Sequence, residues 1–297
     1  MKKIIYFTFI LAIFTIYGNN LSAQVTENKS SSHIEIVATS YPDYYPISFK
    51  IYKGVYKTIQ TIFDNTFDDL TGDNNIFVKY DTGNTLDDNI KHLNSGDYDV
   101  FLGIYNETHS EIKRYSNLEY IFPAVLNNPI HIITTPDNSS KIKTTDDLST
   151  LKGVYISNEY LSDYVQQNFE NNNIEPSVDV FDTYRRLFLG EIDYIIGSYY
   201  FHYVKSVELG LKDYISFSKK PLMTMPMFIA ISKKSFYYDR LRKLLSKKVN
   251  NKNIEEKIKE DLKNYIYEFE KNNLGIVPPK FVLKESSDVK TPAEENL

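Results

Sequence analysis

The chain has 297 residues, no cysteine and a formal net charge of −5, from 39 acidic and 34 basic residues. This acidic balance argues against nucleic acid as a partner, because phosphate binding needs clustered Lys and Arg. The lack of cysteine excludes disulfides, thiolate nucleophiles, Cys-type zinc sites and a lipidated N-terminal cysteine. The length suits two lobes, and the 42% of hydrophobic residues suffices for their cores.

The first 23 residues have the pattern of a secretory signal peptide. Lys2 and Lys3 precede an uncharged run at 4–17, and LSA at 21–23 offers a small residue for cleavage. A membrane-spanning helix needs roughly 20 apolar residues, so a retained anchor is the weaker interpretation. Cleavage removes 23 of 297 residues, two of them Lys and none acidic, which leaves 274 residues and a formal charge of −7. We predict an exported protein, freely soluble in the periplasm.

From residue 34, β-rich runs alternate with helical spacing, which is typical of a layered α/β fold with mostly parallel strands. In the first half, strands are predicted at 34–40, 76–80 and 98–103, and helices at 51–63 and 85–96. The second half repeats this order, with strands at 153–157, 177–181 and 192–197, a helix at 159–171 and a short helix that ends at Gly190.

Two apolar segments that proline interrupts, 122–135 and 221–234, are predicted to cross between two lobes. Residues 33–128 and 226–274 would then form the first lobe, with residues 129–225 inserted as the second. Two such crossings make a hinge.

The carboxyl-terminal part of the chain holds two amphipathic patterns, at 236–249 and 253–272. They predict helices that pack on the first lobe. The Pro, Lys and Glu content rises from residue 275, so residues 275–297 are predicted as a tail whose final dozen residues are disordered.

A repeat links the two halves, because LNSGDYDVFLGIY at 93–105 and LFLGEIDYIIGSY at 187–199 align without a gap. Each copy predicts a helix that stops at a left-handed glycine, a turn and a strand. We favour a structural role for the repeated Leu, first Gly and Asp. Ligands of open α/β sheets lie beyond the carboxyl ends of the strands, so the repeated tyrosines are expected to face one cleft. The shared positions are Leu93/Leu187, Gly96/Gly190, Asp97/Glu191, Asp99/Asp193, Gly103/Gly197 and Tyr105/Tyr199.

Four segments carry a family resemblance: SYPDYYPISF at 40–49, SGDYDVFLG at 95–103, TTDDLSTLKGVYIS at 144–157 and FLGEIDYIIGS at 188–198. In this order they resemble the bacterial extracellular solute-binding proteins of family 3, the periplasmic receptors of ABC importers for amino acids and related polar solutes. The resemblance implies an α/β fold of two lobes, each a layered, mostly parallel sheet. It also implies a monomer that captures a small polar solute between its lobes and meets a membrane ABC permease transiently, with no cofactor and no metal.

Members of that family that bind α-amino acids usually carry an arginine after the first-lobe strand, which forms a forked pair with the ligand carboxylate. Counting back from Phe122-Pro123 places this residue at Arg114. Counting forward from Gly103 places it near Ser110 or Glu111.

The chain also departs from the family pattern in the second lobe. It has Ser157, Asn158 and Glu159 where the family often has Gly-Ser or Gly-Thr, and Gly197-Ser198 where many members place a carboxylate for the ligand ammonium. A standard amino-acid ligand is therefore in doubt, and a cationic ligand held by Asp43, Glu159 and tyrosine rings is the rival. The candidate ligand-binding residues are Asp43, Tyr44, Tyr45, Tyr105, Arg114, Asn158, Glu159, Ser198 and Tyr199.

Signs of an enzyme are few. The five histidines, at 33, 92, 109, 131 and 202, are scattered, and neither H-E-x-x-H nor G-x-S-x-G occurs. We therefore expect a binding protein with no catalytic residues. Two alternatives stay open: a periplasmic dehydratase-like enzyme on the same fold, which needs little more than a positioned acid and a closed cleft, and a sensory or structural homologue that has lost its ligand.

Overall fold

The computed structural model describes residues 34–42, 44, 46–53, 56–61, 63, 67, 76–81, 85–105, 115–142, 144–157, 161–169, 173–250 and 254–279. The predicted signal peptide and almost all of the predicted tail lie outside these residues. The chain divides into two compact units, 1–35 with 73–77 and 36–72 with 78–297. The features below belong to the second unit, apart from the first two residues of β1 and of β4. The predicted lobe boundaries are a different division and stay a prediction.

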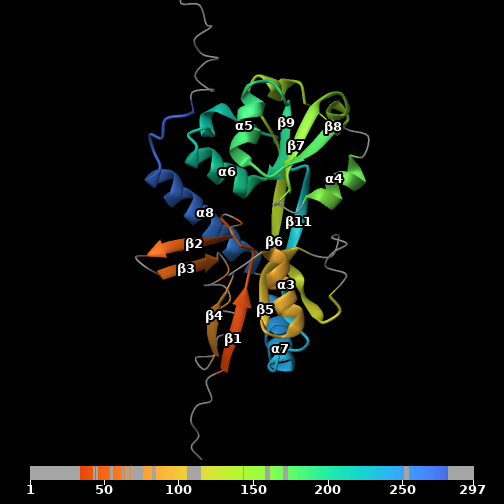
Figure 1. Ribbon diagram of the computed structural model, residues 1–297, viewed down its shortest axis with the longest axis vertical. Helices are drawn as coiled ribbons and strands as arrows, with labels where there is room; N and C mark the ends of the chain where they lie inside the picture. Colours follow the sequence, from red (N-terminus) through yellow and green to blue (C-terminus); the bar gives the residue numbers. More distant parts are fainter. Residues whose placement is uncertain are drawn as a thin grey trace, which may run out of the picture. The chain divides into compact units, whose positions relative to one another are not determined.

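In the described part of the chain, nine strands form one mixed sheet in the order β4-β1-β5-β11-β6-β9-β7-β8, with β10 beside β6 (Figure 1). Its strands are β1 Ile34–Thr39, β4 Ile76–Tyr80, β5 Val100–Tyr105, β6 Leu118–Thr134, β7 Lys152–Ile156, β8 Asn173–Ser177, β9 Tyr194–Ser198, β10 Ser216–Phe217 and β11 Met223–Ser232. The α-helices are α3 Leu86–Ser95, α4 Ser162–Asn168, α5 Val180–Phe188, α6 Tyr199–Glu208, α7 Tyr238–Val249 and α8 Ile254–Asn272. Short 3-10 helices are η2 Asn138–Ser140, η3 Thr145–Thr150 and η5 Lys212–Tyr214.

The sheet holds two groups of parallel strands. β1 runs parallel to β5 in one group, and β7 runs parallel to both β8 and β9 in the other. Between the groups lie β11 and β6, antiparallel to each other and to β5 and β9 respectively. The predicted α/β class is confirmed, and the two segments predicted as crossings are the two strands that join the parallel groups.

The pairing of β6 with β11 is interrupted once. Met227 lies opposite Leu126 on one side of the break and Ile229 lies opposite Ile121 on the other. Residues 122–125 therefore bulge opposite Phe228. The strands pair regularly on both sides of this break, from Met223 onward and up to Ser232.

The structure explains why the repeat occurs twice. Each copy ends a helix at a left-handed glycine, with φ 93° at Gly96 and 70° at Gly190. The aspartate that follows then bonds to one residue of the neighbouring parallel strand through both its backbone and its side chain. Asp99 N donates to Val37 O (2.9 Å), and Asp99 Oδ2 accepts from Val37 N (2.8 Å). Asp193 makes the same pair with Lys152, at 2.8 and 2.9 Å.

The two aspartates give a testable difference. Asp99→Ala should lower the free energy of unfolding by about 2–4 kcal/mol, because the buried carboxylate accepts from both Val37 N and Ser235 Oγ. Asp193→Ala removes one bond from a less buried group and should cost about 1–2 kcal/mol. Urea denaturation measures both. The Asn variants, which keep an acceptor oxygen, should lose less; equal losses for Ala and Asn at position 99 would contradict this role.

The predicted helix at 51–63 is wrong. β2 Ser48–Lys53 and β3 Tyr56–Thr61 form an antiparallel two-stranded sheet in its place. The apolar spacing of four also fits two short strands, and these runs are rich in β-branched and aromatic residues with Gly54 between them. The high strand propensity of these residues therefore decides the structure of this segment, and the helical spacing of its apolar residues does not.

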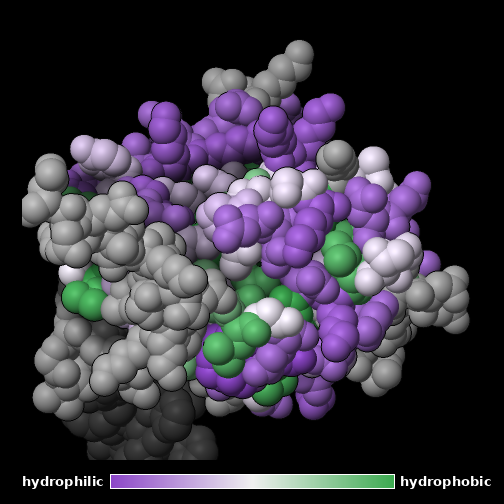
Figure 2. All heavy atoms as spheres, turned by 90° about the horizontal axis from the view of Figure 1, so that it is seen from above, coloured by the Kyte–Doolittle hydropathy of each residue, from purple (hydrophilic) through white to green (hydrophobic). Residues whose placement is uncertain are grey.

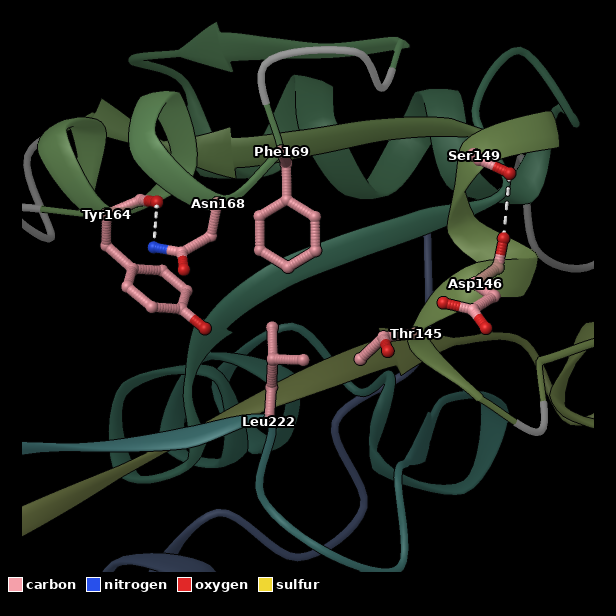
Figure 3. A pocket seen from close by; sticks show the side chains of 7 residues that line it. All are labelled: Thr145, Asp146, Ser149, Tyr164, Asn168, Phe169 and Leu222. Carbon is pink, nitrogen blue, oxygen red and sulfur yellow. Dashed lines mark hydrogen bonds between the residues drawn. The ribbon is translucent and has the colours of Figure 1, made fainter.

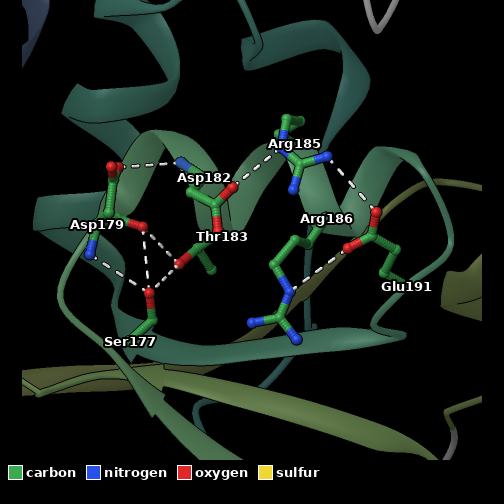
Figure 4. Close-up of polar contacts among 7 residues, drawn as sticks. All are labelled: Ser177, Asp179, Asp182, Thr183, Arg185, Arg186 and Glu191. Atoms are coloured by element: carbon green, nitrogen blue, oxygen red, sulfur yellow. Dashed lines mark hydrogen bonds and ion pairs between the residues drawn. The ribbon is translucent and has the colours of Figure 1, made fainter.

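The predicted strand at 177–181 is also misplaced, because β8 ends at Ser177 and α5 begins at Val180. Asp179 caps the helix by accepting from Asp182 N (3.0 Å), and Thr183 Oγ1 donates to Ser177 Oγ (2.9 Å) (Figure 4). Arg185 pairs with Asp182 on the next turn. Because Asp179 is the N-cap, the helix begins at Val180, which the sequence pattern had assigned to a strand.

Helix α8 packs against β6 and α6. Glu255 near its start accepts from Asn127 Nδ2 (2.9 Å), and Glu270 near its end accepts from Tyr203 Oη (2.9 Å) and pairs with Lys212. Besides β6, α8 therefore also contacts α6 and η5, which come from the segment predicted as the inserted lobe.

Apolar side chains form the core where α5 packs against the sheet. One core cluster joins Ile133 of β6, Val154 of β7 and Ile195 of β9 with Tyr184 and Leu187 of α5. On the face that Figure 2 shows, hydrophilic residues predominate and hydrophobic ones form small patches. None of the helices in the described segments has the length and apolar character that crossing a bilayer requires.

Candidate functional site

Four buried polar side chains meet where the two parallel groups approach β6. Asn128 Nδ2 donates to Tyr105 Oη (2.7 Å) and to Tyr44 Oη (3.1 Å), and its Oδ1 accepts from Ser198 Oγ (2.9 Å). The two tyrosine hydroxyls are 2.9 Å apart. All four residues are at most 4% exposed. We call this set the Asn128 network.

The fold places each member at the end of a strand or in a crossing strand. Tyr105 ends β5, Ser198 ends β9, Tyr44 follows β1, and Asn128 lies in β6 between them. Tyr105 and Ser198 thus lie at the carboxyl ends of strands, where ligands of open α/β sheets bind. Ser198 also caps α6, since its Oγ accepts from Phe201 N at 3.5 Å.

The hydrogen bonds have a defined direction. The side-chain amide of Asn128 donates one hydrogen bond to each tyrosine hydroxyl. In the bond between the two hydroxyls, one tyrosine therefore donates and the other accepts. Tyr105 N in turn donates to Tyr41 Oη at 3.1 Å. Hydrogen bonds among buried side chains restrict the arrangements that these side chains can adopt.

Aromatic packing fixes the rings of the network. Tyr44 stacks on Phe201 of α6, with centroids 6.2 Å apart and an interplanar angle of 16°. Tyr41 lies 5.4 Å from Tyr44 and 5.7 Å from Tyr105, centroid to centroid. Contacts of this kind add to the area that the rings bury.

Three of the predicted site residues, Tyr44, Tyr105 and Ser198, come together in this network. Tyr199 does not, because consecutive residues point in different directions and it opens α6. The remaining predicted residues, Asp43, Tyr45, Arg114, Asn158 and Glu159, lie outside the described residues.

Tyr199 lies in a second aromatic cluster. Its ring is 5.0 Å from Phe217, 5.5 Å from His131 and 5.6 Å from Tyr203, between centroids. Burial raises the pKa of Tyr199 and lowers the pKa of His131, whose Nδ1 lies 2.9 Å from Ser218 O. The expectation that Tyr105 and Tyr199 would face one another is replaced by a contact route from Tyr105 through Asn128 to Ser198.

Sequence reasoning missed Asn128, the centre of the network. Its signal was present, since Asn-Asn-Pro interrupts an apolar crossing strand at 127–129. A polar residue inside a buried strand needs hydrogen-bond partners. Among the described residues, no group of three or more His, Asp or Glu side chains could hold a metal ion.

No family model matches the sequence, and no curated protein matches it. Solved structures do. An amino acid ABC transporter substrate-binding protein from Streptococcus pneumoniae bound to L-arginine aligns with TM-score 0.59 and 14% identity, over 78% of this chain and 94% of that one. An ancestral cationic amino acid solute-binding protein aligns with TM-score 0.58 and 15% identity, over 80% and 97%.

A histidine kinase sensor domain with similarity to periplasmic binding proteins aligns with TM-score 0.57 and 16% identity, over 84% of this chain and 99% of that one. The chain has the periplasmic-binding-protein-like fold. At these identities the likeness concerns the fold, and it confirms the predicted class. Transport receptors and sensor domains both use this periplasmic-binding-protein-like fold, so the fold by itself does not choose between them.

Proposed function

We propose that the protein captures a small polar solute in a cleft between two lobes, residues 33–128 with 226–274 and residues 129–225. The observation that carries this proposal is the Asn128 network. It connects the end of β5 to the end of β9 through β6, at the place where ligands of such sheets bind. In this proposal the network forms the floor of the cleft, and β6 with β11 forms the hinge.

The proposed solute is amino-acid-like or a cationic amine. Two of the similar structures are proteins for arginine or cationic amino acids, which supports this class. Asp43 and Glu159 would contact a cationic group, together with the ring of Tyr45. Arg114 would take a carboxylate, and Tyr199 and Asn158 would border the cleft.

The proposed setting is the periplasm, with delivery of the solute to an ABC importer. The predicted signal peptide and the lack of cysteine support an exported, unlipidated protein. A closed, liganded form would be the one that a permease recognises, since a ligand shifts the population toward the conformation that binds it better. We propose that the protein acts as a monomer and carries out no catalysis.

The test is a thermal-shift screen of the mature protein with L-arginine, L-lysine, putrescine, succinate and prephenate. A ligand at about 100 times its Kd should stabilise the protein by about 2.7 kcal/mol, which is several degrees in Tm. For a cationic hit, Asp43→Asn should weaken binding about tenfold or more, and for a carboxylate hit Arg114→Lys should do so. Tyr267→Phe, at an exposed position of α8, is the control.

One observation favours a second candidate, a sensory or structural protein without a ligand. The side chains of the Asn128 network already hydrogen-bond to one another and are almost fully buried. No shift with any compound in the screen would support this candidate and contradict solute capture. Conversion of prephenate would instead indicate the dehydratase-like alternative.

A further inference from the structure

A groove outside the Asn128 network is formed by two adjoining pockets. The larger, about 770 Å³ in volume, is lined by β10, the loop at 218–222, two residues of β6 and the residues Ser139, Ser140, Ile142, Thr144 and Thr145. The smaller, about 540 Å³, is lined by η3 and α4 (Figure 3). Thr145 and Leu222 line both pockets. Each volume is within the range of small-molecule sites, roughly 300–1,000 Å³.

The lining of the larger pocket is positively charged. Lys219 and Lys220 line it, and its described lining contains no Asp or Glu. Within the residues that the structure describes, neither lysine forms an ion pair. The backbone anchors them, because Ser218 N donates to Ile132 O and Leu222 N donates to Ile130 O, so β6 holds both sides of the Lys219–Lys220 loop.

The smaller pocket has the opposite character. Asp146 lines it with the rings of Tyr164 and Phe169, whose centroids are 5.9 Å apart at 71°. In Figure 3 the Phe169 ring lies between Tyr164 and Thr145, directed into the pocket. The neighbouring Asp147 caps η3 by accepting from Thr144 N, whereas Asp146 has no ion pair within the described chain. Figure 3 places Asp146 on the other side of Thr145 from the two rings, so its carboxylate offers a partner for an ammonium group and the rings offer apolar contact.

The lining of the larger pocket combines seven serine and threonine residues with apolar side chains. Leu222 lines both pockets, and Phe217 and Ile132 add to the apolar part of the larger one. Thr145, which also lines both pockets, offers a hydroxyl that makes no hydrogen bond within the described residues. Opposite charges in two adjoining pockets select the orientation of a bound molecule.

We propose that this groove binds a linear zwitterion, with a carboxylate at Lys219 and Lys220, an ammonium group at Asp146, and an alkyl chain against Leu222 and Phe169. The groove shares no residue with the Asn128 network, although Phe217 in its wall contacts Tyr199, which would border the proposed cleft. The groove is a second binding site on the segment 132–222.

The test is calorimetry with the ω-amino acids 5-aminopentanoate, 8-aminooctanoate and 11-aminoundecanoate, compared with octanoate and octylamine. At least one ω-amino acid should bind about tenfold tighter than either singly charged compound, since each charge-assisted contact contributes separately. Lys219→Gln with Lys220→Gln should weaken the ω-amino acid and octanoate and spare octylamine. Asp146→Asn should weaken the ω-amino acid and octylamine and spare octanoate.

Lys243→Gln with Lys247→Gln, two exposed lysines of α7, is the matched charge control and should change none of these affinities. Asp43→Asn should also leave binding in the groove intact, which separates this proposal from the cleft. Equal affinity for octanoate, octylamine and the ω-amino acids would overturn the proposal. So would Lys-dependent binding of octanoate with no gain from an added ammonium group, or ω-amino acid binding that neither groove variant weakens.

Discussion

Asn128→Ala is expected to lower the free energy of unfolding by about 2–4 kcal/mol. The substitution removes both donors to the tyrosine hydroxyls and the acceptor of Ser198 Oγ, in a site with at most 4% exposure. Each buried group left without a partner costs about 1–3 kcal/mol, but the two tyrosine hydroxyls keep the bond to each other, so the total stays near the cost of one or two groups. Urea or thermal unfolding of the variant beside the parent protein measures the loss.

The neighbouring residue provides a matched control for this prediction. Asn127→Ala removes one hydrogen bond to Glu255 from a partly buried site and should cost under about 1 kcal/mol. Asn128→Leu, which refills the volume without polar atoms, should be no better than Asn128→Ala, because the partners still lose their bonds. If Asn128→Leu were as stable as the parent protein, side-chain volume at this position would matter and its hydrogen bonds would not.

Gly103→Ala should be the more damaging of two similar glycine substitutions, with a loss of about 2–5 kcal/mol. Gly103 has φ 75°, where an alanine is strained by about 1–2 kcal/mol. It is also the unpaired residue of a bulge, since Ile104 faces Phe228 and Leu102 faces Ile229. An added Cβ would lie 2.4 Å from Phe63 Cε2, and overpacking of this kind costs about 1–3 kcal/mol.

Gly190→Ala separates these two causes. Its φ of 70° gives the same backbone strain, but no atom lies within 4 Å of the added Cβ, so its loss should be about 1–2 kcal/mol. Phe63→Leu should partly rescue Gly103→Ala by withdrawing the ring, which a double-mutant cycle in urea would detect. Equal losses for the two glycine variants, with no rescue, would rule out the Phe63 clash.

The buried strands β5 and β9 could be predicted because each is an apolar run that follows an aspartate and contains a glycine near its end. The helix at 85–96 was predicted correctly: Thr85 caps it, Gly96 ends it, and Leu93 is fully buried. The repeat also identified Tyr105 and Ser198 as neighbours of the site. Local chemistry dictates these features, so the sequence carries them.

Other features depend on contacts between distant residues, which local patterns do not report. Spacing alone could not separate a helix from the β2–β3 hairpin. The centre of the Asn128 network depends on which strands become neighbours in the sheet. Tyr199 differs from Ser198 by a single position, and only the start of α6 decides which of the two turns toward Asn128.

The break in the ladder between β6 and β11 bears on the proposed hinge motion. The two strands are paired on both sides of the point where residues 122–125 bulge opposite Phe228. The ladder between β5 and β11 shifts its register at the same place, next to Gly103. If the proposed lobes turn about β6 and β11, two neighbouring irregularities would let the sheet bend there with little loss of paired backbone.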